Sequence, residues 1–242
     1  MNGEPEIKSS IQVTYFSHMK DFLRSPNAVR PKVVFFDAVG TLFGVVGSVG
    51  LQYATIAKRH GVIATADNLD KSFYAAFKRS GSPAFPGAAT VDIPNLEYEW
   101  WKEITRASFE GAPMFADFDA FFADLFTYFA SGEPWAIYPE TIQTLDFFRE
   151  FGITIGIISN FDSRLYSVLR SLSLDHYFQS VTISTEVGAA KPNGKIFTIA
   201  LARHNCMAGE AWHVGDSLKE DYEAATAMGL RGILVDRNAA EG

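Results

Sequence analysis

Five short apolar runs along the chain predict buried β-strands. The first is Val33–Phe36, and Asp37 follows it directly. Its apolar character is continuous rather than alternating, which is typical of a strand buried on both faces of a parallel sheet. Similar runs lie at 153–159, 181–184, 212–214 and 232–235.

Helical patterns separate these runs. Apolar residues recur at helical spacing within 141–150, 163–171, 195–205 and 219–228. Strand and helix therefore alternate along the second half of the chain. This alternation predicts an α/β fold with a doubly wound, Rossmann-like parallel sheet.

Residues 45–131 interrupt the alternation. Apolar and aromatic side chains fall on helical faces near Phe73, Trp101 and Phe122, and a loop rich in Pro and Gly spans 81–94. We expect an all-helical insertion with no strand, between core segments 32–44 and 132–242. Aromatic residues at helical spacing usually form a core, so we expect these to form one rather than a substrate pocket.

The first 31 residues have no obvious partner in this architecture. We expect these residues to form an extension with one short helix around 13–23, and we assign them no function. They also lack a cationic segment followed by an apolar one, so we expect no secretory signal.

Composition limits the classes of partner. Hydrophobic residues make up 48% of the chain and charged residues 20%, which is enough for a core. The net charge of −7 argues against nucleic-acid binding and against an anionic membrane surface as a partner.

No apolar run approaches the roughly 18 residues of a membrane span. A single cysteine, Cys206, allows no intrachain disulfide, and we expect a reducing soluble compartment such as the cytoplasm.

Two polar motifs follow the first strands of the predicted core. Asp37 begins the first, Asp37-Ala38-Val39-Gly40-Thr41. An unpaired carboxylate after a buried strand is costly, which points to a nucleophile or metal ligand, although Asp also commonly starts turns. Ser159 and Asn160 follow the second strand and could donate to a phosphate oxygen or cap a helix.

Two further motifs follow the later strands. Lys191 precedes Pro192, so we expect a turn lysine that buries little surface, and Lys191→Ala should weaken anion binding without unfolding the protein. Asp216 and Asp221 lie where a strand ends and a helix begins, which suits Mg²⁺ or a helix N-terminus. The neighbouring His213 is expected to be buried and hydrogen-bonded rather than a ligand.

Taken in order, the four motifs closely resemble those of the haloacid dehalogenase-like hydrolase superfamily. The resemblance covers about residues 32–237, and the insertion at 45–131 looks like the helical cap of that superfamily. The stretches 159–165 and 186–192 are similar to its rhythmically-expressed-protein-like subgroup.

The resemblance implies a role for each motif residue. Asp37 would be the nucleophile and Lys191 would offset charge on the transferring group. Thr41, Ser159 and Asn160 would bind the substrate or its phosphate. Mg²⁺ would be held by Asp37, the Val39 carbonyl, Asp216 and Asp221, and the partner would be a small phosphorylated molecule or another anionic substrate.

The chain departs from the phosphatase pattern at Val39. Phosphatases of the superfamily usually carry a second aspartate at this position as general acid and base. A valine side chain cannot move a proton, and such catalysis is typically worth about 10²–10⁴-fold. We therefore expect phosphoryl hydrolase activity that is weak or restricted to good leaving groups.

Two alternatives remain open. A non-catalytic binding protein of the same fold would explain Val39 but leaves the other intact motifs without a purpose. A 2-haloacid dehalogenase needs no acid at that position, and the motif around Asp37 is similar to that of the dehalogenases. Those enzymes use an arginine soon after the nucleophile, whereas no Arg or Lys occurs here between Asp37 and Lys58.

Overall fold

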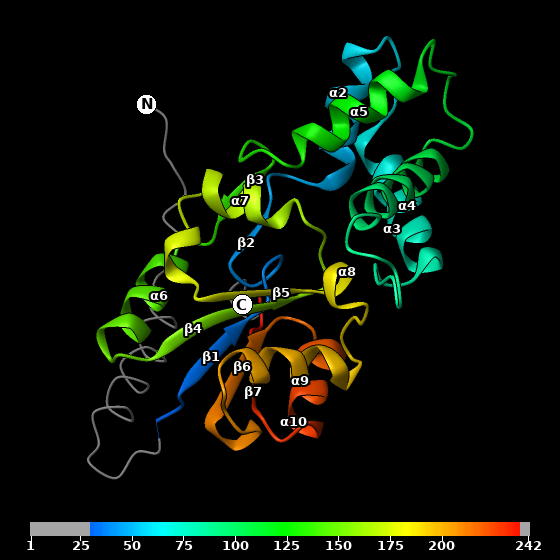
Figure 1. Ribbon diagram of the computed structural model, residues 1–242. Coiled ribbons are helices and arrows are strands. Elements are labelled where there is room, and N and C mark those ends of the chain that lie inside the picture. The colour runs from blue at the N-terminus through cyan, green and yellow to red at the C-terminus, as the bar shows by residue number, and fades with distance from the viewer. Residues whose placement is uncertain (1–29, 238–242) are drawn as a thin grey trace, which may run out of the picture.

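A computed structural model describes residues 30–237 of the chain (Figure 1). The helix expected around 13–23 lies outside the described residues. The strands are β1 (Val33–Phe36), β2 (Phe43–Val45), β3 (Trp135–Ile137), β4 (Thr154–Ser159), β5 (Ser180–Ile183), β6 (Ala211–Gly215) and β7 (Arg231–Leu234). The longer helices are α2 (Val49–Arg59), α3 (Ala66–Ser80), α4 (Ile93–Ser108), α5 (Phe118–Tyr128), α6 (Thr141–Glu150), α7 (Leu165–Ser171) and α9 (Gly194–Arg203). The short helices are α8 (Ser184–Val187), α10 (Ala224–Ala227), η1 (Asp175–Tyr177), η2 (Ala208–Glu210) and η3 (Leu218–Glu223).

Five parallel strands form the central sheet, in the order β5-β4-β1-β6-β7. Phe36 at the end of β1 pairs with Ile157 on one side and Val214 on the other. The strand order reverses at β1, so a crevice is expected at the carboxyl end of that strand. The doubly wound sheet predicted from the sequence is confirmed.

Helices cover both faces of the sheet, with α6 and α7 on one side and α9 and α10 on the other (Figure 1). Alternate residues of β1 point to opposite faces, because side chains of a strand alternate. Val34 and Phe36 pack into the cluster of α6 and α7, while Val33 and Phe35 pack into that of α9 and α10. All four side chains are buried, which explains the unbroken apolar run in the sequence.

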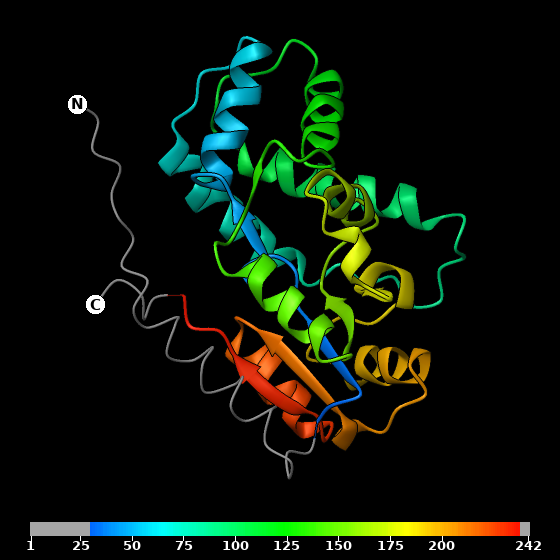
Figure 2. The ribbon, with the colours of Figure 1, turned by 90° about the vertical axis from the view of Figure 1, so that its left-hand side faces the viewer.

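Helices α2 to α5 lie together beyond the carboxyl edge of the sheet (Figures 1 and 2). They enclose a separate apolar cluster that includes Tyr53, Phe73, Ile104 and Phe121. The aromatic periodicity of this region therefore does build a core, as expected.

Two three-residue strands connect these helices to the sheet domain. Strand β2 leads out and β3 leads back, and they pair antiparallel with Phe43 opposite Ile137 and Val45 opposite Trp135. The expectation of no strand in 45–131 is wrong at Val45. A three-residue run carries too little local pattern to be recognised, and its partner lies about ninety positions further on.

The helix predicted over 219–228 begins as a π-helix. Residues Leu218–Glu223 form η3, and the four-residue α10 follows. The amide of Tyr222 donates to the carbonyl of Ser217 at 3.2 Å, five residues back, so the first turn is wide. This wide turn lets the Asp221 side chain face inward, where it accepts from the Ser217 amide at 3.0 Å.

Within residues 30–237, no helix combines the length and the apolar character that crossing a membrane requires.

Candidate active site

Three predicted site residues meet at the carboxyl edge of the sheet. Asp37 follows β1, Ser159 ends β4 and Asp216 follows β6. Since β4 and β6 flank β1, their ends lie side by side. This is the edge at which open α/β sheets place their sites.

Lys191 enters this edge from the loop between α8 and α9. Its Nζ lies 2.7 Å from Oδ1 of Asp37 and 2.5 Å from Oδ1 of Asp221. Only 2% of Lys191 is exposed, so the expectation of a turn lysine that buries little surface is wrong. The backbone is in a turn, but the side chain is drawn inward by two carboxylates that no local pattern reveals.

The charges of this cluster hold each other in place. Burial would lower the pKa of Lys191, but the carboxylates of Asp37 and Asp221 outweigh burial and raise that pKa. For Asp221, an acid, burial acts in the opposite direction and would raise the pKa. The hydrogen bond from His213 and the charge of Lys191 outweigh burial and hold that pKa well below its ordinary value.

His213 supports Asp221 from β6, as expected from the sequence. It is fully buried, its Nε2 lies 2.9 Å from Oδ1 of Asp221, and its ring packs edge-on against Phe197. Burial lowers the pKa of His213 and thus favours the neutral imidazole. Its Nδ1 is the one buried side-chain polar atom in 30–237 without a hydrogen-bond partner, which fits an imidazole protonated on Nε2 alone.

Asp216 completes the acidic group from the loop after β6. Oδ1 of Asp216 accepts from Oγ1 of Thr41 at 3.3 Å. Burial raises the pKa of Asp216, and the negative charges of Asp37 and Asp221 raise it further. Gly40 makes this approach possible: its φ is +90°, and a Cβ there would lie 2.3 Å from a carboxylate oxygen of Asp216.

These carboxylates fit a divalent cation. Asp37, Asp216 and Asp221 each offer an oxygen, and the three oxygens lie within 4.8 Å of one another. The ionised cluster holds three carboxylates and one ammonium, so it carries an excess of negative charge that a dication would balance. Oxygen donors are also the ligands that Mg²⁺ prefers.

Asn160 holds the Lys191 loop in position. Its Nδ2 donates to the Lys191 carbonyl at 2.9 Å and to Oε2 of Glu220 at 3.0 Å, while its Oδ1 accepts from the Lys191 amide at 2.7 Å. The motif alone leaves open whether Asn160 donates to a phosphate oxygen or caps a helix, and here the amide nitrogen instead makes both of its hydrogen bonds within the protein. Burial raises the pKa of Glu220, a neighbour that the motif reading did not single out.

Arg237 is a further residue of the site, and no motif in the sequence points to it. It donates from Nε to the Gly40 carbonyl at 2.9 Å, and from its other nitrogens to the Thr41 carbonyl and to Glu140. Its guanidinium lies 3.7 Å from the centroid of the Tyr138 ring. Arg237 thus holds the loop that follows Asp37, although it lies almost 200 positions away in the chain. Nothing in the sequence near Arg237 indicates these contacts.

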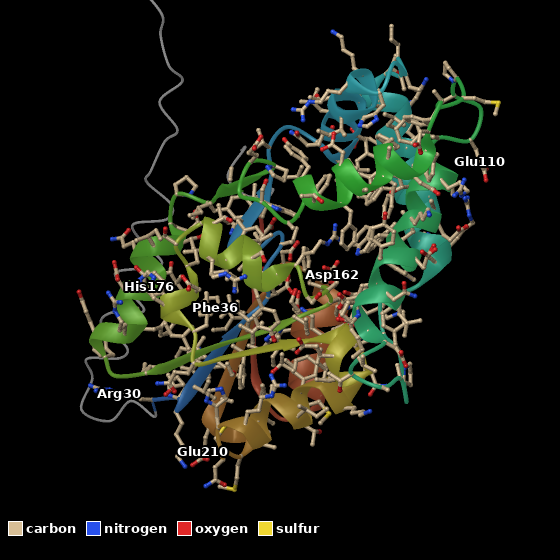
Figure 3. The ribbon with its side chains drawn as sticks, turned by 45° about the horizontal axis from the view of Figure 1, so that its top comes forward. Arg30, Phe36, Glu110, Asp162, His176 and Glu210 are labelled. Atoms are coloured by element: carbon tan, nitrogen blue, oxygen red, sulfur yellow. The ribbon has the colours of Figure 1, made fainter. Side chains whose placement is uncertain are left out.

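Polar contacts join α4 to the start of α7. Glu97 accepts from the backbone amide of Ser163 at 2.9 Å and from its hydroxyl, and Trp101 donates from Nε1 to Oδ2 of Asp162 at 2.5 Å. Asp162 lies between the sheet domain and the helices (Figure 3). It also forms a two-point ion pair with Arg164, with N···O distances of 2.9 and 2.7 Å.

A cavity of about 240 Å³ lies beside the carboxylate cluster. Val39 and Asn160 form part of its wall, and Phe73, Phe77 and Trp101 belong to the rest. We expected the aromatic residues of 45–131 to form a core rather than a pocket, but several of them line this cavity as well. The spacing of residues on a helix shows which side is apolar, and does not show whether a neighbour fills the space beside it.

Known proteins share this fold and much of this sequence. Residues 31–229 match the model of a hydrolase family, the haloacid dehalogenase-like hydrolases. The haloacid dehalogenase-like hydrolase domain-containing protein 3 of Xenopus laevis is 31% identical over 206 residues, covering 84% of each chain. The rhythmically expressed gene 2 protein of Drosophila melanogaster is 28% identical, covering 85% of this chain and 83% of the relative.

Solved structures give the same fold for two kinds of enzyme. A haloacid dehalogenase-type phosphatase from Thermococcus onnurineus has a TM-score of 0.59 and 24% identity, covering 86% of this chain and 87% of that chain. A 2-haloacid dehalogenase from Pseudomonas syringae has a TM-score of 0.59 and 22% identity, covering 84% and 86%. The fold alone therefore does not separate the two reactions.

Proposed function

Because the chain belongs to the haloacid dehalogenase-like hydrolase family, we propose that it is a Mg²⁺-dependent phosphoryl hydrolase with Asp37 as its nucleophile. The observation that carries this proposal is the cluster of Asp37, Asp216 and Asp221, in which Lys191 pairs with Asp37 and Asp221. The buried ammonium of Lys191 pairs with only two of the three carboxylates, and the third, Asp216, adds repulsion, so stability alone does not explain the cluster.

Mg²⁺ would be held by Asp37, the Val39 carbonyl and Asp216, with Asp221 in support. When bound, it would neutralise charge on the phosphoryl oxygens and on the attacking carboxylate. The raised pKa of Asp216 supports this role, since burial and the neighbouring carboxylates both disfavour its ionised form and a dication would stabilise that form.

In the proposed reaction, an oxygen of Asp37 attacks phosphorus and the bond from phosphorus to the leaving oxygen breaks. Water then hydrolyses the aspartyl phosphate and releases inorganic phosphate. Lys191 holds the nucleophile by one oxygen and offsets negative charge on the transferring group. Ser159 would bind the phosphoryl group, while Thr41 and Asn160 position Asp216 and Lys191.

We assign residues 45–131 the role of a cap that supplies the wall opposite the nucleophile. The contacts of Glu97 and Trp101 with 162–163 support this role, because they fix α4 against the loop after β4. The leaving oxygen takes its proton from water, since Val39 cannot supply one. Substrates with good leaving groups should therefore react best.

Hydrolysis of 4-nitrophenyl phosphate, with and without Mg²⁺, tests the proposal. We expect Mg²⁺-dependent turnover in the wild type and a loss of about 10³-fold or more in Asp37→Asn. Asp67→Asn is the matched control, because Asp67 is an exposed acid at the start of α3. Turnover equal in Asp37→Asn and wild type would overturn the assignment of the nucleophile, and an inert wild type would favour a non-catalytic binding protein.

A further inference from the structure

The cavity beside the carboxylate cluster has an unusual wall for a site that handles phosphate. It lies between the loops after β1 and β4 and the helices α2 to α5. Val39, two positions after Asp37, and Asn160, which holds the Lys191 backbone, are both part of its lining. A group attached to a phosphoryl on Asp37 would therefore have this cavity next to it.

Aromatic rings make up most of the cavity wall. Trp101 stacks nearly parallel to Phe73 at 6.4 Å between ring centroids, and it stacks on Phe77 at 5.9 Å. Phe122 and Phe126 of α5 also line the cavity. The hydrogen bond from Trp101 to Asp162 holds the indole in this orientation without a ligand.

Only one formally charged side chain is among the described residues that line the cavity. This residue is Arg164, and its charge is already balanced by an ion pair with Asp162. Asp162 binds it at two points, and a third nitrogen donates to the Phe126 carbonyl at 3.5 Å. The guanidinium lies 4.0 Å from the Phe126 centroid and 5.0 Å from that of Trp101, so it adds a flat face to the wall.

We propose that this cavity binds an uncharged aromatic group, and that the preferred substrates are phosphate monoesters of phenol-like compounds. This inference rests on the proposed phosphoryl hydrolase function. An apolar cavity of about 150 Å³ is enough for benzene, so about 240 Å³ has room for a substituted ring or two fused rings.

The same wall disfavours two other substrate classes. The hydroxyls of a sugar phosphate would face aromatic rings with few hydrogen-bond partners, and burying an unpaired hydroxyl is costly. A carboxylate on the substrate would have no free cation among the described lining residues, because Arg164 is paired with Asp162. The second argument also disfavours a 2-haloacid as substrate.

Phenyl phosphate and 4-carboxyphenyl phosphate form a matched pair for the test. The added carboxylate makes the phenol a better leaving group, so intrinsic reactivity favours the second compound. We expect the wild type to prefer phenyl phosphate by about 10²-fold in kcat/KM, because the cavity rejects the charge. Equal rates, or a preference for the carboxylate, would overturn the inference while leaving the hydrolase function intact.

Binding of 2-naphthol, measured by calorimetry, separates the cavity from the chemistry. Phe77→Asn places an amide in the wall and should weaken binding at least about tenfold. Phe118→Asn is the control, because Phe118 is a partly buried phenylalanine of α5 outside the cavity lining, and binding should be unchanged. If neither ester is hydrolysed but naphthol binding depends on Phe77, the hydrolase function fails and the ligand class stands. If naphthol does not bind the wild type, the ligand class fails.

Discussion

At the scale of single residues, the ammonium of Lys191 pairs with two buried carboxylates, those of Asp37 and Asp221. Lys191→Met preserves most of the side-chain length but leaves Asp37 and Asp221 without a counter-charge. Removing one partner of a buried ion pair typically costs about 3–5 kcal/mol, and we expect a loss of this size in the free energy of unfolding. Urea denaturation of wild type and variant at neutral pH measures it.

The exposed Lys195, four positions further on at the start of α9, provides the control. Lys195→Met should change the free energy of unfolding by no more than about 0.5 kcal/mol. If Lys191→Met unfolds at the same urea concentration as Lys195→Met, the ammonium does not stabilise the cluster, and the argument from buried charge is wrong.

Val39 is the second residue at which a prediction can be made. Val39→Asp should supply the missing general acid and raise the turnover of an alkyl phosphate by about 10²-fold, with a much smaller gain on 4-nitrophenyl phosphate. Valine and aspartate have similar volumes, so the change fits sterically. Steady-state rates on propyl phosphate and 4-nitrophenyl phosphate give the comparison, and Val46→Asp at an exposed position should leave both rates unchanged.

An equal gain on both esters would contradict the acid role, because a leaving group that departs as an anion has little need of a proton. Such a result would indicate that Val39→Asp acts on phosphate binding or on the metal site instead.

At the scale of elements, the junction between α4 and α7 depends on one acid. Glu97 is 1% exposed and accepts from the amide and hydroxyl of Ser163. Burial raises the pKa of Glu97 above 4.5, although its hydrogen bonds with Ser163 and Thr185 act in the opposite direction. The folded protein therefore keeps a proton on Glu97 at a pH where the unfolded chain has lost it.

The sign of the pH effect follows from this difference. The free energy of unfolding should fall as the pH rises from about 4.5 through the raised pKa of Glu97, and level off above it. Glu97→Gln cannot ionise, and its amide can still pair with Ser163. We therefore expect the variant to match the wild type near pH 4 and to be more stable than the wild type at pH 8.

Urea denaturation at the two pH values measures this effect, and the difference between the two proteins cancels the titration of the other acids. Glu99→Gln, on the exposed side of the same helix, should follow the wild type at both values. Parallel pH profiles for Glu97→Gln and wild type would show that Glu97 does not hold its proton in the fold.

At the scale of the whole molecule, the acidic cluster proposed to hold Mg²⁺ should lower the stability of the metal-free protein. Burial raises the pKa of Asp216, and the negative charges of Asp37 and Asp221 raise it further, so Asp216→Asn should stabilise the metal-free protein. Mg²⁺ should reverse the order, because ligand binding to the folded state adds about 2.7 kcal/mol at one hundred times Kd. For a protein of this size the added energy raises Tm by about 5–10 °C in the wild type.

Thermal unfolding of both proteins, with and without Mg²⁺, gives the four values needed. Asp67→Asn should show the full wild-type response to Mg²⁺, since Asp67 lies on α3 and outside the cluster. An equal rise of Tm in Asp216→Asn and wild type would mean that Asp216 is not a ligand.

The sequence by itself determined the parallel sheet. Strand β1 is an unbroken apolar run because its alternate side chains are buried on opposite faces, and such a local pattern is visible without any partner. The positions of Asp37, Ser159 and Asp216 at strand ends followed directly, because parallel strands end at a common edge. The same logic of local pattern identified the apolar faces of α3, α4 and α5.

Only the tertiary structure decided how these residues meet. Lys191 lies 154 positions from Asp37 in the chain. Its side chain is buried because it pairs with two carboxylates, and the residues around Lys191 in the sequence give no sign of this pairing. Arg237 reaches Gly40 across 197 positions, and β2 finds its partner in β3. The cavity beside Val39 is likewise the space that the packed elements leave unfilled. The apolar periodicity of a helix shows which of its faces is apolar, but it does not show where a gap remains between two such faces. Local pattern records which side chains avoid water, whereas charge pairing and cavity shape depend on contacts between residues that are distant in the chain.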